Sequence, residues 1–371
     1  MSTYYIGLMS GTSLDGVDAV LVDFVGPTPK IIQSAFTCFP ETLRTELLSL
    51  QTPNGDNELA RSMLAANALA DLYAQLVQDL LKLARLRPEQ IRAIGAHGQT
   101  LRHQPELGYS VQLNAPARLA ELTGISVIAD FRSRDIAAGG EGAPLVPAFH
   151  AAMLHHEHKH RAVLNLGGMS NLSMLPARHS SLPVFGFDCG PANILLDTWA
   201  QKHLGKSFDL DGQWAASGEV NADLLEWLLH EPYFSKAPPK STGRDLFNLT
   251  WLEEQLALST ASALSHADVQ ATLLMLTVET VANALDQHMP NCQQVFVCGG
   301  GAHNTYLMQR LGRRLPHIQW QTTDEVGIPA QSMEALAFAW LAWRHIQRLP
   351  GSLPAVTGAK EARILGAYYP A

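Results

Sequence analysis

The sequence predicts an α/β protein of two related lobes, and three observations lead to this prediction. The chain has 371 residues, more than a single hydrophobic core usually serves. Two pairs of apolar runs surround a glycine turn, one within residues 4–25 and one within residues 162–175, and both are typical of β-hairpins. Each hairpin is followed by further apolar strands and helical patterns, an order that favours sheets covered by helices.

The first lobe is expected to begin with three strands and then alternate between helices and strands. Apolar side chains from Leu59 to Leu80 recur at intervals of three and four residues, which predicts a long amphipathic helix. The expected elements are strands at 4–9, 17–25 and 31–39, a helix at 57–83, a strand at 91–96, a helix at 115–122 and a strand at 125–129.

The second lobe is expected to repeat this organisation. Pro191 is interpreted as the start of a helix that runs to about His203. Ser265 with Asp268 resembles a capping pair for a helix that ends near His288. Strands are expected at 162–166, 169–175, 184–187 and 295–298, and a buried helix near 335–343. The predicted boundaries are 1–135 plus about 345–371 for the N-terminal lobe and 136–344 for the C-terminal lobe.

Composition limits the classes of function. The formal net charge of −8 disfavours a nucleic-acid binder, which would need to neutralise phosphates. No apolar stretch reaches the roughly 18–20 residues that span a bilayer, and the first residues lack the basic and apolar segments of a signal peptide. The spacing of the four cysteines indicates neither a disulfide framework nor a zinc cage. We therefore expect a cytoplasmic protein with reduced thiols, without nucleic-acid or membrane partners.

Three glycine-rich turns follow apolar strands, at Ser10–Gly16, Asn165–Asn171 and Gly299–Asn304. Such turns let backbone N–H groups approach an anionic ligand closely, although a single one is common in any α/β protein. Three in one chain favour one nucleotide bound in a cleft between the lobes. The P-loop pattern, the protein-kinase signatures and the dinucleotide-binding glycine spacing are all missing from the sequence.

Motifs along essentially the whole chain resemble the anhydro-N-acetylmuramic acid kinases, a family of the sugar kinase/heat-shock chaperone/actin superfamily. The resemblance rests on the segments Met9–Asp18, His97–Thr100, Phe131–Arg132, Asp135–Pro147, Asn165–Asn171, Phe187–Asn193, Ser241–Arg244, Cys298–Asn304, Glu334–Ala339 and Pro354–Ala359. It implies two related actin-like (ribonuclease H-like) lobes with a nucleotide cleft between them.

The resemblance also implies a function. The family uses ATP with Mg²⁺ to open the 1,6-anhydro ring of 1,6-anhydro-N-acetylmuramic acid hydrolytically and to phosphorylate the 6-oxygen. The products are N-acetylmuramic acid 6-phosphate and ADP, in peptidoglycan recycling. The expected partner is this small sugar, and the resemblance implies a homodimer. Another sugar kinase, or an actin-like ATPase of the same superfamily, remains an alternative because fold alone does not define function.

The resemblance assigns the nucleotide to the glycine turns. The implied ATP-binding residues are Gly11, Thr12, Ser13, Leu14, Asp15, Gly16, Val17, Asp18, Gly167, Gly168, Ser170, Asn171, Gly299, Gly300 and Gly301. Many proteins of the superfamily carry an aspartate at the tip of the first strand, whereas this chain has Ser10-Gly11-Thr12-Ser13 there. Whether Asp15 or Asp18 approaches Mg²⁺, directly or through water, is left open.

Two carboxylates are candidates for catalysis. Asp188 follows an apolar strand and precedes Gly190-Pro191, so its residue pattern fits either a helix N-cap or a side chain that projects into a cleft. The resemblance favours the second role and makes Asp188 the general base that activates water. It also places Glu334 near the sugar, where this carboxylate would orient the water.

Two residues are candidates for binding the sugar. Arg132 would pair with the lactyl carboxylate through its guanidinium group, and His97 would hydrogen-bond the sugar. Arg134 fits a solvated loop better.

His156-Glu157-His158-Lys159-His160 formally matches the zinc motif His-Glu-x-x-His. That motif needs both histidines on one face of a helix, whereas a strand expected from about Ala162 leaves almost no helix after His160. The sequence therefore favours a solvated segment over a zinc site.

Overall fold

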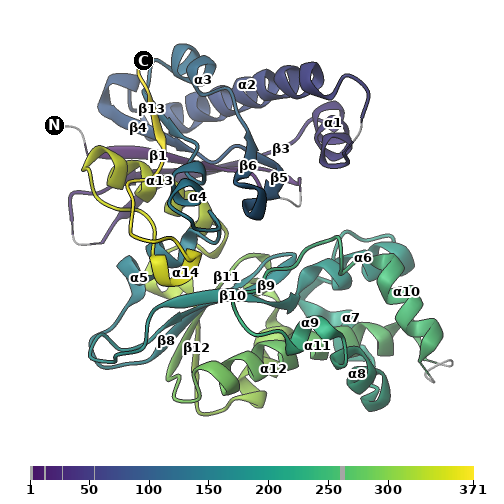
Figure 1. Cartoon of the computed structure of the whole chain (residues 1–371). Helices are drawn as coiled ribbons and strands as arrows, with labels where there is room; N and C mark the ends of the chain where they lie inside the picture. Colours follow the sequence, from purple (N-terminus) through teal and green to yellow (C-terminus); the bar gives the residue numbers. More distant parts are fainter. Residues whose placement is uncertain (1–2, 12–13, 27, 54, 260–263) are drawn as a thin grey trace. The chain divides into compact units, whose positions relative to one another are not determined.

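The computed structural model describes residues 3–11, 14–26, 28–53, 55–259 and 264–371 (Figure 1). The chain forms two compact units: unit 1 comprises Met1–Met153 and Ser332–Ala371, and unit 2 comprises Leu154–Gln331. The sequence analysis placed the boundaries at 135/136 and 344/345 instead. Residues 136–153 belong to unit 1 partly because Glu141 N–H bonds the Thr357 carbonyl at 2.8 Å and Lys360 N–H bonds the Ala138 carbonyl at 3.0 Å. Such pairings between distant segments leave no local pattern.

Unit 1 is built on a six-stranded sheet with the order β13-β7-β4-β1-β2-β3. The first three strands form an antiparallel meander, and β4 and β7 run parallel to β1. A separate hairpin pairs β5 with β6. The bounds are β1 Tyr4–Met9, β2 Gly16–Asp23, β3 Lys30–Cys38, β4 Ile91–Ala96, β5 Gln99–Gln104, β6 Tyr109–Leu113, β7 Val127–Ala129 and β13 Ala367–Tyr369. The five strands expected in this lobe are thus confirmed, with shifts of a few residues at their ends.

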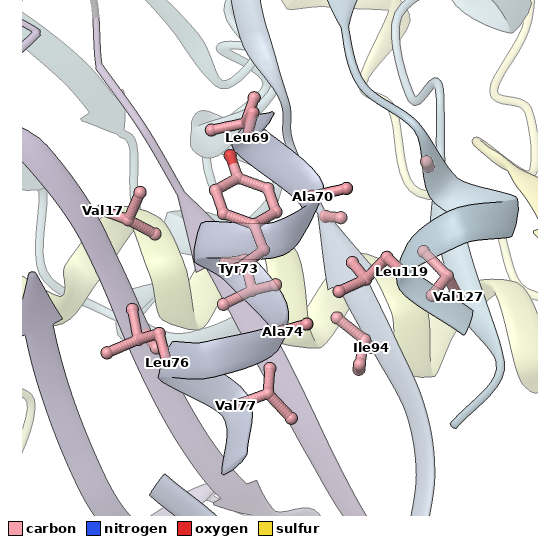
Figure 2. Close-up of a cluster of buried hydrophobic side chains, with 14 of the residues drawn as sticks. Val17, Leu69, Ala70, Tyr73, Ala74, Leu76, Val77, Ile94, Leu119 and Val127 are labelled. Atoms are coloured by element: carbon pink, nitrogen blue, oxygen red, sulfur yellow. The ribbon is translucent and has the colours of Figure 1, made fainter. Parts of the chain in front are cut away.

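The long helix α2 supplies much of the core of unit 1. Its buried residues Leu69, Tyr73 and Val77 recur every four positions and meet the sheet residues Val17 and Ile94 (Figure 2). The expected helix at 57–83 is therefore confirmed. The helices of unit 1 are α1 Glu41–Gln51, α2 Glu58–Ala84, α3 Pro116–Thr123, α4 Ser133–Ala137, α5 Val146–Leu154, α13 Met333–Ile346 and α14 Pro354–Thr357, with 3-10 turns at Pro88–Gln90 and Pro105–Leu107.

Two glycines place helix α13 directly on this sheet. Gly7 of β1 pairs in register with Gly95 of the parallel neighbour β4. A Cβ on Gly7 would lie 1.9 Å from the Ala335 carbonyl oxygen, and a Cβ on Gly95 would lie 2.1 Å from the Phe338 carbonyl oxygen. Only glycine permits this approach of helix backbone to strand backbone. The packing draws residues 332–344 into unit 1 and fixes the position of Glu334.

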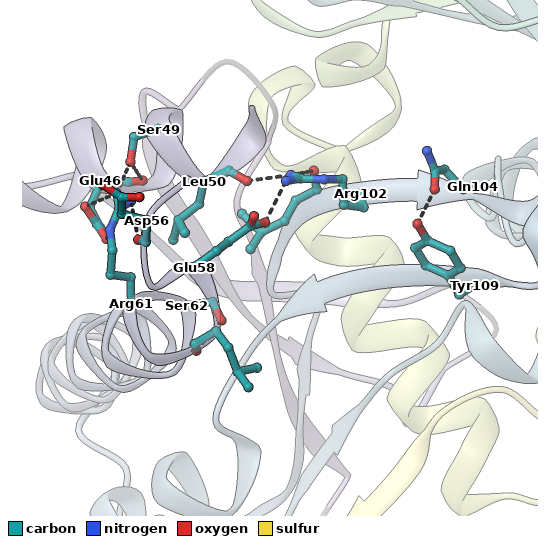
Figure 3. A network of polar contacts seen from close by, with 12 residues as sticks. Glu46, Ser49, Leu50, Asp56, Glu58, Arg61, Ser62, Arg102, Gln104 and Tyr109 are labelled. Carbon is teal, nitrogen blue, oxygen red and sulfur yellow. Dashed lines mark hydrogen bonds and ion pairs between the residues drawn. The ribbon is translucent and has the colours of Figure 1, made fainter. Parts of the chain in front are cut away.

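A polar network ties α1 to α2 and α2 to β5 (Figure 3). Arg61 holds Glu46 through two bonds, Nε to Oε1 at 2.7 Å and Nη2 to Oε2 at 2.9 Å. Arg102 of β5 bonds Glu58 at 2.7 Å and also donates to the Leu50 carbonyl. These pairs are partly exposed, so each contributes only about 0–1 kcal/mol. They link α1, α2 and β5.

Unit 2 repeats the sheet of unit 1. Its strand order is β10-β9-β8-β11-β12, with an antiparallel meander of three strands followed by two strands parallel to the first. This is the order and the direction of β3-β2-β1-β4-β7 in unit 1. The bounds are β8 Arg161–Leu166, β9 Met169–Leu175, β10 Phe185–Pro191, β11 Gln294–Cys298 and β12 Gln319–Thr322. The prediction of two related α/β lobes is confirmed.

Helices α6, α7, α8 and α12 of unit 2 pack against the buried helix α11. Ser265 caps it, because its side chain accepts the Asp268 N–H while the Asp268 carboxylate accepts the Ser265 N–H, as predicted. The helices are α6 Asn193–Leu204, α7 Gln213–Ser217, α8 Ala222–Leu229, α9 Pro232–Ser235, α10 Leu249–Leu258, α11 His266–His288 and α12 Thr305–Arg314, with 3-10 turns at Leu210–Gly212, Gly300–His303, Thr323–Val326 and Ala330–Ser332. Of the helices that the structure describes, none is long and apolar enough to cross a membrane.

Candidate active site

In unit 1 the candidate residues gather where β1 and β4 end. Because these strands are parallel, the residues that follow them, Ser10 and His97, lie at the same edge of the sheet. The Ser10 hydroxyl lies 3.0 Å from the Tyr73 hydroxyl and donates to the Gly98 carbonyl at 3.0 Å. His97 N–H donates to the Leu8 carbonyl at 3.1 Å. These hydrogen bonds link the ends of β1 and β4 to each other and to α2.

The half-buried Arg132 pairs with the buried His97. Arg132 Nη2 lies 2.9 Å from His97 Nε2, and Arg132 Nη1 donates to the Gly142 carbonyl at 2.9 Å. A guanidinium only donates, so Nε2 accepts and the imidazole proton sits on Nδ1, which lies 3.3 Å from the Ser10 carbonyl. Burial and the neighbouring Arg132 charge lower the pKa of His97 to about 3. His97 is therefore neutral, with a defined tautomer.

Asp135 stabilises the loop that holds Arg132, a role that the sequence analysis did not assign to it. The fully buried carboxylate accepts the Gly142 N–H at 2.9 Å and the Thr357 hydroxyl at 2.9 Å. The loop whose Gly142 carbonyl holds Arg132 is thereby fixed to the C-terminal segment. Asp135 lay inside a motif of the resemblance, but a buried structural acid has no distinct local pattern. Arg134 is exposed, as the sequence analysis favoured.

Carboxylates accumulate beside the same edge. Glu334 lies in the first turn of α13, where burial raises its pKa and the charge of Arg132 partly opposes the rise. Burial, followed by the nearby charges of Glu334 and Asp15, raises the pKa of Asp18 to about 7. Asp15 is exposed. The structure thus groups Asp18, Glu334 and Arg132 electrostatically, although they lie far apart in the sequence.

The remaining predicted residues of the first turn differ in their surroundings. Thr12 and Ser13 lie outside the described residues. The side chains of Leu14 and Val17 are fully buried in the core, so only their backbone could reach a ligand. Gly16 is needed by the fold, because a Cβ there would lie 2.2 Å from the Thr37 carbonyl oxygen. The Gly11 carbonyl accepts the side-chain amide of Gln99 at 3.2 Å.

In unit 2 the two remaining glycine turns meet at the N-terminus of α6. The Gly167 carbonyl accepts the Asn193 N–H at 3.0 Å, and the Gly168 carbonyl accepts the Ala192 N–H at 2.9 Å. Asn193 Nδ2 donates to the Leu166 carbonyl at 3.0 Å and lies 3.8 Å from the position of a Cβ on Gly300. Asn193 therefore lies beside both turns, and the sequence analysis had assigned it no role.

Two polar residues assigned to the turn at 165–171 also have structural roles. The Ser170 side chain is fully buried and donates to the Gly190 carbonyl at 3.1 Å. Asn171 lies opposite Asp188 in the ladder between β9 and β10.

Asp188 lies inside strand β10 and not at its end. The sequence analysis ended this strand at Phe187 and began a helix at Pro191, and both expectations are wrong. The ladder continues to Pro191 through a register shift between Asp188 and Gly190. Cys189 is the extra residue of this bulge, and Gly190 and Pro191 pair with β9 instead of starting a helix. Ala192 is the N-cap of α6, which excludes the N-cap reading of Asp188.

The surroundings of Asp188 tune its acidity. The half-buried carboxylate accepts the Thr242 N–H through Oδ2 at 3.0 Å. Burial raises the pKa of Asp188 to about 6, and the hydrogen bond from Thr242 limits the rise. A carboxylate with a pKa near this value is ionised at neutral pH yet still basic enough to accept a proton.

The histidine-rich segment does not form a zinc-protease helix. Helix α5 ends at Leu154 and β8 starts at Arg161, so His156 and His160 lie in the connection between them. No group of three or more His, Cys, Asp or Glu side chains in the described ranges is arranged to hold a metal ion. All four cysteines fall within those ranges and are free thiols, as expected.

The duplicated sheet order and the glycine turns that follow its strands define a two-lobed α/β protein of the actin-like (ribonuclease H-like) class. Residues 3–371 match the model of the family "Anhydro-N-acetylmuramic acid kinase". The chain belongs to this family and is therefore a phosphotransferase.

Relatives with that family name are similar over nearly the whole chain. One from Bordetella pertussis is 57% identical over 369 residues, which are 99% of this chain and 96% of that protein. One from Cupriavidus pinatubonensis is 54% identical over 99% of this chain and 98% of that protein. One from Nitrosomonas europaea is 52% identical over 99% of this chain and 100% of that protein.

Solved structures are more distant. The activator of the 2-hydroxyisocaproyl-CoA dehydratase from Clostridium difficile with bound ADPNP has a TM-score of 0.48 at 13% identity, over 93% of this chain and 96% of that chain. Nothing further follows from that likeness.

Proposed function

We propose that this chain uses ATP to convert 1,6-anhydro-N-acetylmuramic acid into N-acetylmuramic acid 6-phosphate and ADP, in peptidoglycan recycling. Membership of the family supports the substrate. The mechanism is supported by the environment of Asp188, a half-buried carboxylate with a pKa of about 6 that accepts a backbone N–H. The substrate has no free 6-hydroxyl, so water must take part in the reaction.

Asp188 is the general base of this reaction. It accepts a proton from water as the water oxygen bonds to the anomeric carbon. The bond between that carbon and the bridging 6-oxygen breaks, and the 6-oxygen attacks the γ-phosphorus of ATP. The bond from this phosphorus to the β,γ-bridging oxygen breaks, and ADP leaves. Positioned general bases contribute about 10²–10⁴-fold to such rates.

Unit 1 supplies the sugar-binding residues. Arg132 Nε is buried and has no hydrogen-bond partner among the residues that the structure describes. A buried unpaired donor costs stability unless a ligand satisfies it, and a guanidinium fits the lactyl carboxylate of the sugar. His97 fixes Arg132 through Nε2, so it acts in the same subsite. Glu334, coupled to Arg132, is the second catalytic carboxylate and orients the water.

ATP is assigned to the glycine turns, through the backbone at Gly11–Asp18, Gly167–Asn171 and Gly299–Gly301. Mg²⁺ is usually bound by one or two carboxylates together with substrate phosphates. Asp18 fits this requirement, because its pKa is raised first by burial and then by the nearby charges of Glu334 and Asp15, which a cation would neutralise. Asp15 is the alternative. The bound Mg²⁺ would neutralise charge on the phosphates.

The setting of the reaction is proposed on the same basis. We place the enzyme in the cytoplasm, where ATP is available, with the sugar as its small-molecule partner and a homodimer as its assembly. We propose no nucleic-acid or membrane partner.

The experiment is turnover in water labelled with heavy oxygen, quenched early because reducing sugars exchange the anomeric oxygen. Mass spectrometry should find the label at the anomeric carbon and none in the phosphate ester. Asp188→Asn should lower kcat at least 10²-fold while ATP binding stays unchanged, and the exposed Asp245→Asn serves as the matched control. Label in the ester, or near-normal turnover of Asp188→Asn, would refute the mechanism. Equal activity on reducing N-acetylmuramic acid would indicate an ordinary sugar kinase.

A further inference from the structure

Asp188 lies on an exposed strand edge that one segment covers. Strand β10 is at the end of the sheet and pairs only with β9, so every second backbone group on it faces away from the ladder. At Asp188 the segment Tyr233–Thr242 satisfies these groups. The Tyr233 hydroxyl donates to the Asp188 carbonyl at 2.7 Å, and Asp188 N–H donates to the Lys240 carbonyl at 3.2 Å. Together with the Thr242 N–H on the carboxylate, this segment holds Asp188 at three points.

One side chain closes this segment on itself. Lys240 Nζ donates to the carbonyls of Tyr233 and Phe234 at 3.3 and 3.0 Å, both within the short helix α9 (Pro232–Ser235). The same ammonium lies 4.9 Å from the centre of the Tyr233 ring and 5.7 Å from that of the Phe187 ring. Lys240 thus fixes the backbone and the ring of the residue whose hydroxyl holds Asp188.

We propose that Lys240 is a positioning residue for Asp188: its ammonium locks the segment Tyr233–Thr242, and the locked segment orients the Asp188 carboxylate. This inference rests on the proposed function, because it matters for catalysis only if Asp188 is the base. Lys240 itself touches no reacting atom. Without its ammonium, the carbonyls of α9 lose two charge-assisted donors, and the Thr242 N–H loses the constraint that directs it at Asp188.

The electrostatic consequence has a definite sign. The Thr242 N–H stabilises the charged carboxylate, so a looser segment raises the pKa of Asp188 towards the value set by burial alone. The titratable groups around Asp188 are Tyr233 on α9, Lys240 on the covering segment and Cys189 on its own strand. His288 of α11 lies beyond them and lines a cavity of about 110 Å³ with Lys240 and Cys189.

That cavity leaves room for an arginine in place of Lys240, which serves as the conservative variant. Arginine at position 240 can extend into it and still donate to the carbonyls of α9, whereas methionine keeps the length of lysine without a donor. Lys236 is the matched control lysine, because it belongs to the same segment and lies over the same Tyr233 ring at 5.8 Å but is exposed.

The test compares Lys240→Met, Lys240→Arg, Tyr233→Phe and Lys236→Met by pH profiles of kcat/KM for the anhydro sugar. Lys240→Met and Tyr233→Phe should lower kcat about tenfold and move the acid limb upward by about one pH unit, since one hydrogen bond to a charged group has roughly this effect. The KM for ATP should not change. Lys240→Arg should restore both quantities, and Lys236→Met should match the wild type. Hydrogen exchange of the peptides around 188 and 242 should accelerate only in Lys240→Met and Tyr233→Phe.

An acid limb at the wild-type pH in folded Lys240→Met would overturn the inference, and so would equal losses in Lys240→Arg and Lys240→Met. If Lys240→Met does not fold, Tyr233→Phe decides alone, because it removes only the hydroxyl. Asp188→Asn separates the two proposals. An active Asp188→Asn refutes the base itself, whereas an inactive Asp188→Asn beside unaltered Lys240 and Tyr233 variants refutes only the positioning role.

Discussion

The glycine turn at Gly299–Gly301 offers a sharp test of the nucleotide site, because neighbouring glycines there differ in what the fold requires. A Cβ on Gly300 would have Asn193 Nδ2 at 3.8 Å as its nearest neighbour, which is an ordinary contact. A Cβ on Gly301 would lie 2.6 Å from the Leu166 Cβ. Gly300 is also exposed. The fold therefore tolerates a side chain at 300 but not at 301.

These distances translate into opposite expectations for two valine variants. Gly300→Val should change stability by about 0.5 kcal/mol or less, as exposed substitutions usually do. Gly301→Val should cost about 1–3 kcal/mol through overpacking, which lowers Tm by about 2–4 °C for each kcal/mol in a unit of this size. If backbone at Gly300 approaches the phosphates, the valine should raise the KM for ATP at least tenfold, equivalent to about 1.4 kcal/mol of lost binding.

The assay is coupled ADP release at saturating sugar, with thermal melts of both variants and calorimetric titration of an ATP analogue. The KM for the sugar should stay at the wild-type value in Gly300→Val, since the sugar is assigned to unit 1. A folded Gly300→Val with the wild-type KM for ATP would show that this turn does not touch the nucleotide, and the assignment of ATP to Gly299–Gly301 would then be wrong.

Three further predictions follow from unit 1. The raised pKa of Asp18 means that the folded state binds its proton more tightly than the unfolded chain, so this group's stability contribution is lost as pH rises from about 4 to about 7. Asp18→Asn should therefore raise Tm relative to the wild type at pH 8 and not at pH 4; a pH-independent difference in Tm would contradict this. Arg132→Lys should raise the KM for the sugar about 10–100-fold without changing that for ATP, because an ammonium cannot keep the guanidinium geometry; an unchanged KM for the sugar would remove Arg132 from the subsite. Gly7→Ala should lower the free energy of unfolding by about 1–3 kcal/mol in denaturant titrations, because α13 must move away from β1. Gly312→Ala inside α12, where the nearest neighbour of the added Cβ lies at 3.9 Å, should raise the free energy of unfolding by at most about 1 kcal/mol. Equal effects of the two alanines would refute the packing argument.

The sequence by itself determined the elements whose signals are local. The hairpin glycines, the four-residue spacing along α2 and the Ser265 cap each lie within a few residues of the structure they specify. Hydrophobic periodicity and capping act between near neighbours, so they can be read without knowing the fold. The family motifs added the identities of Asp188 and Glu334, but not their surroundings.

Only the tertiary structure decided how distant residues combine. Local pattern alone ended β10 at Phe187, because a bulge depends on the pairing partner and not on the strand's own residues. The assignment of α13 to unit 1 depends on Gly7 and Gly95, which become complementary to the helix only once β1 and β4 are neighbours.

The same reason explains which contacts within the site were not predicted. Arg132 contacts His97 from 35 positions away, and Thr242 reaches Asp188 from 54 positions away. Tyr233 and Lys240 lie in a segment without periodicity, so nothing in their immediate sequence distinguishes them from loop residues. Their roles arise from hydrogen bonds to an exposed strand edge, and the position of that edge is set by the packing of the whole sheet.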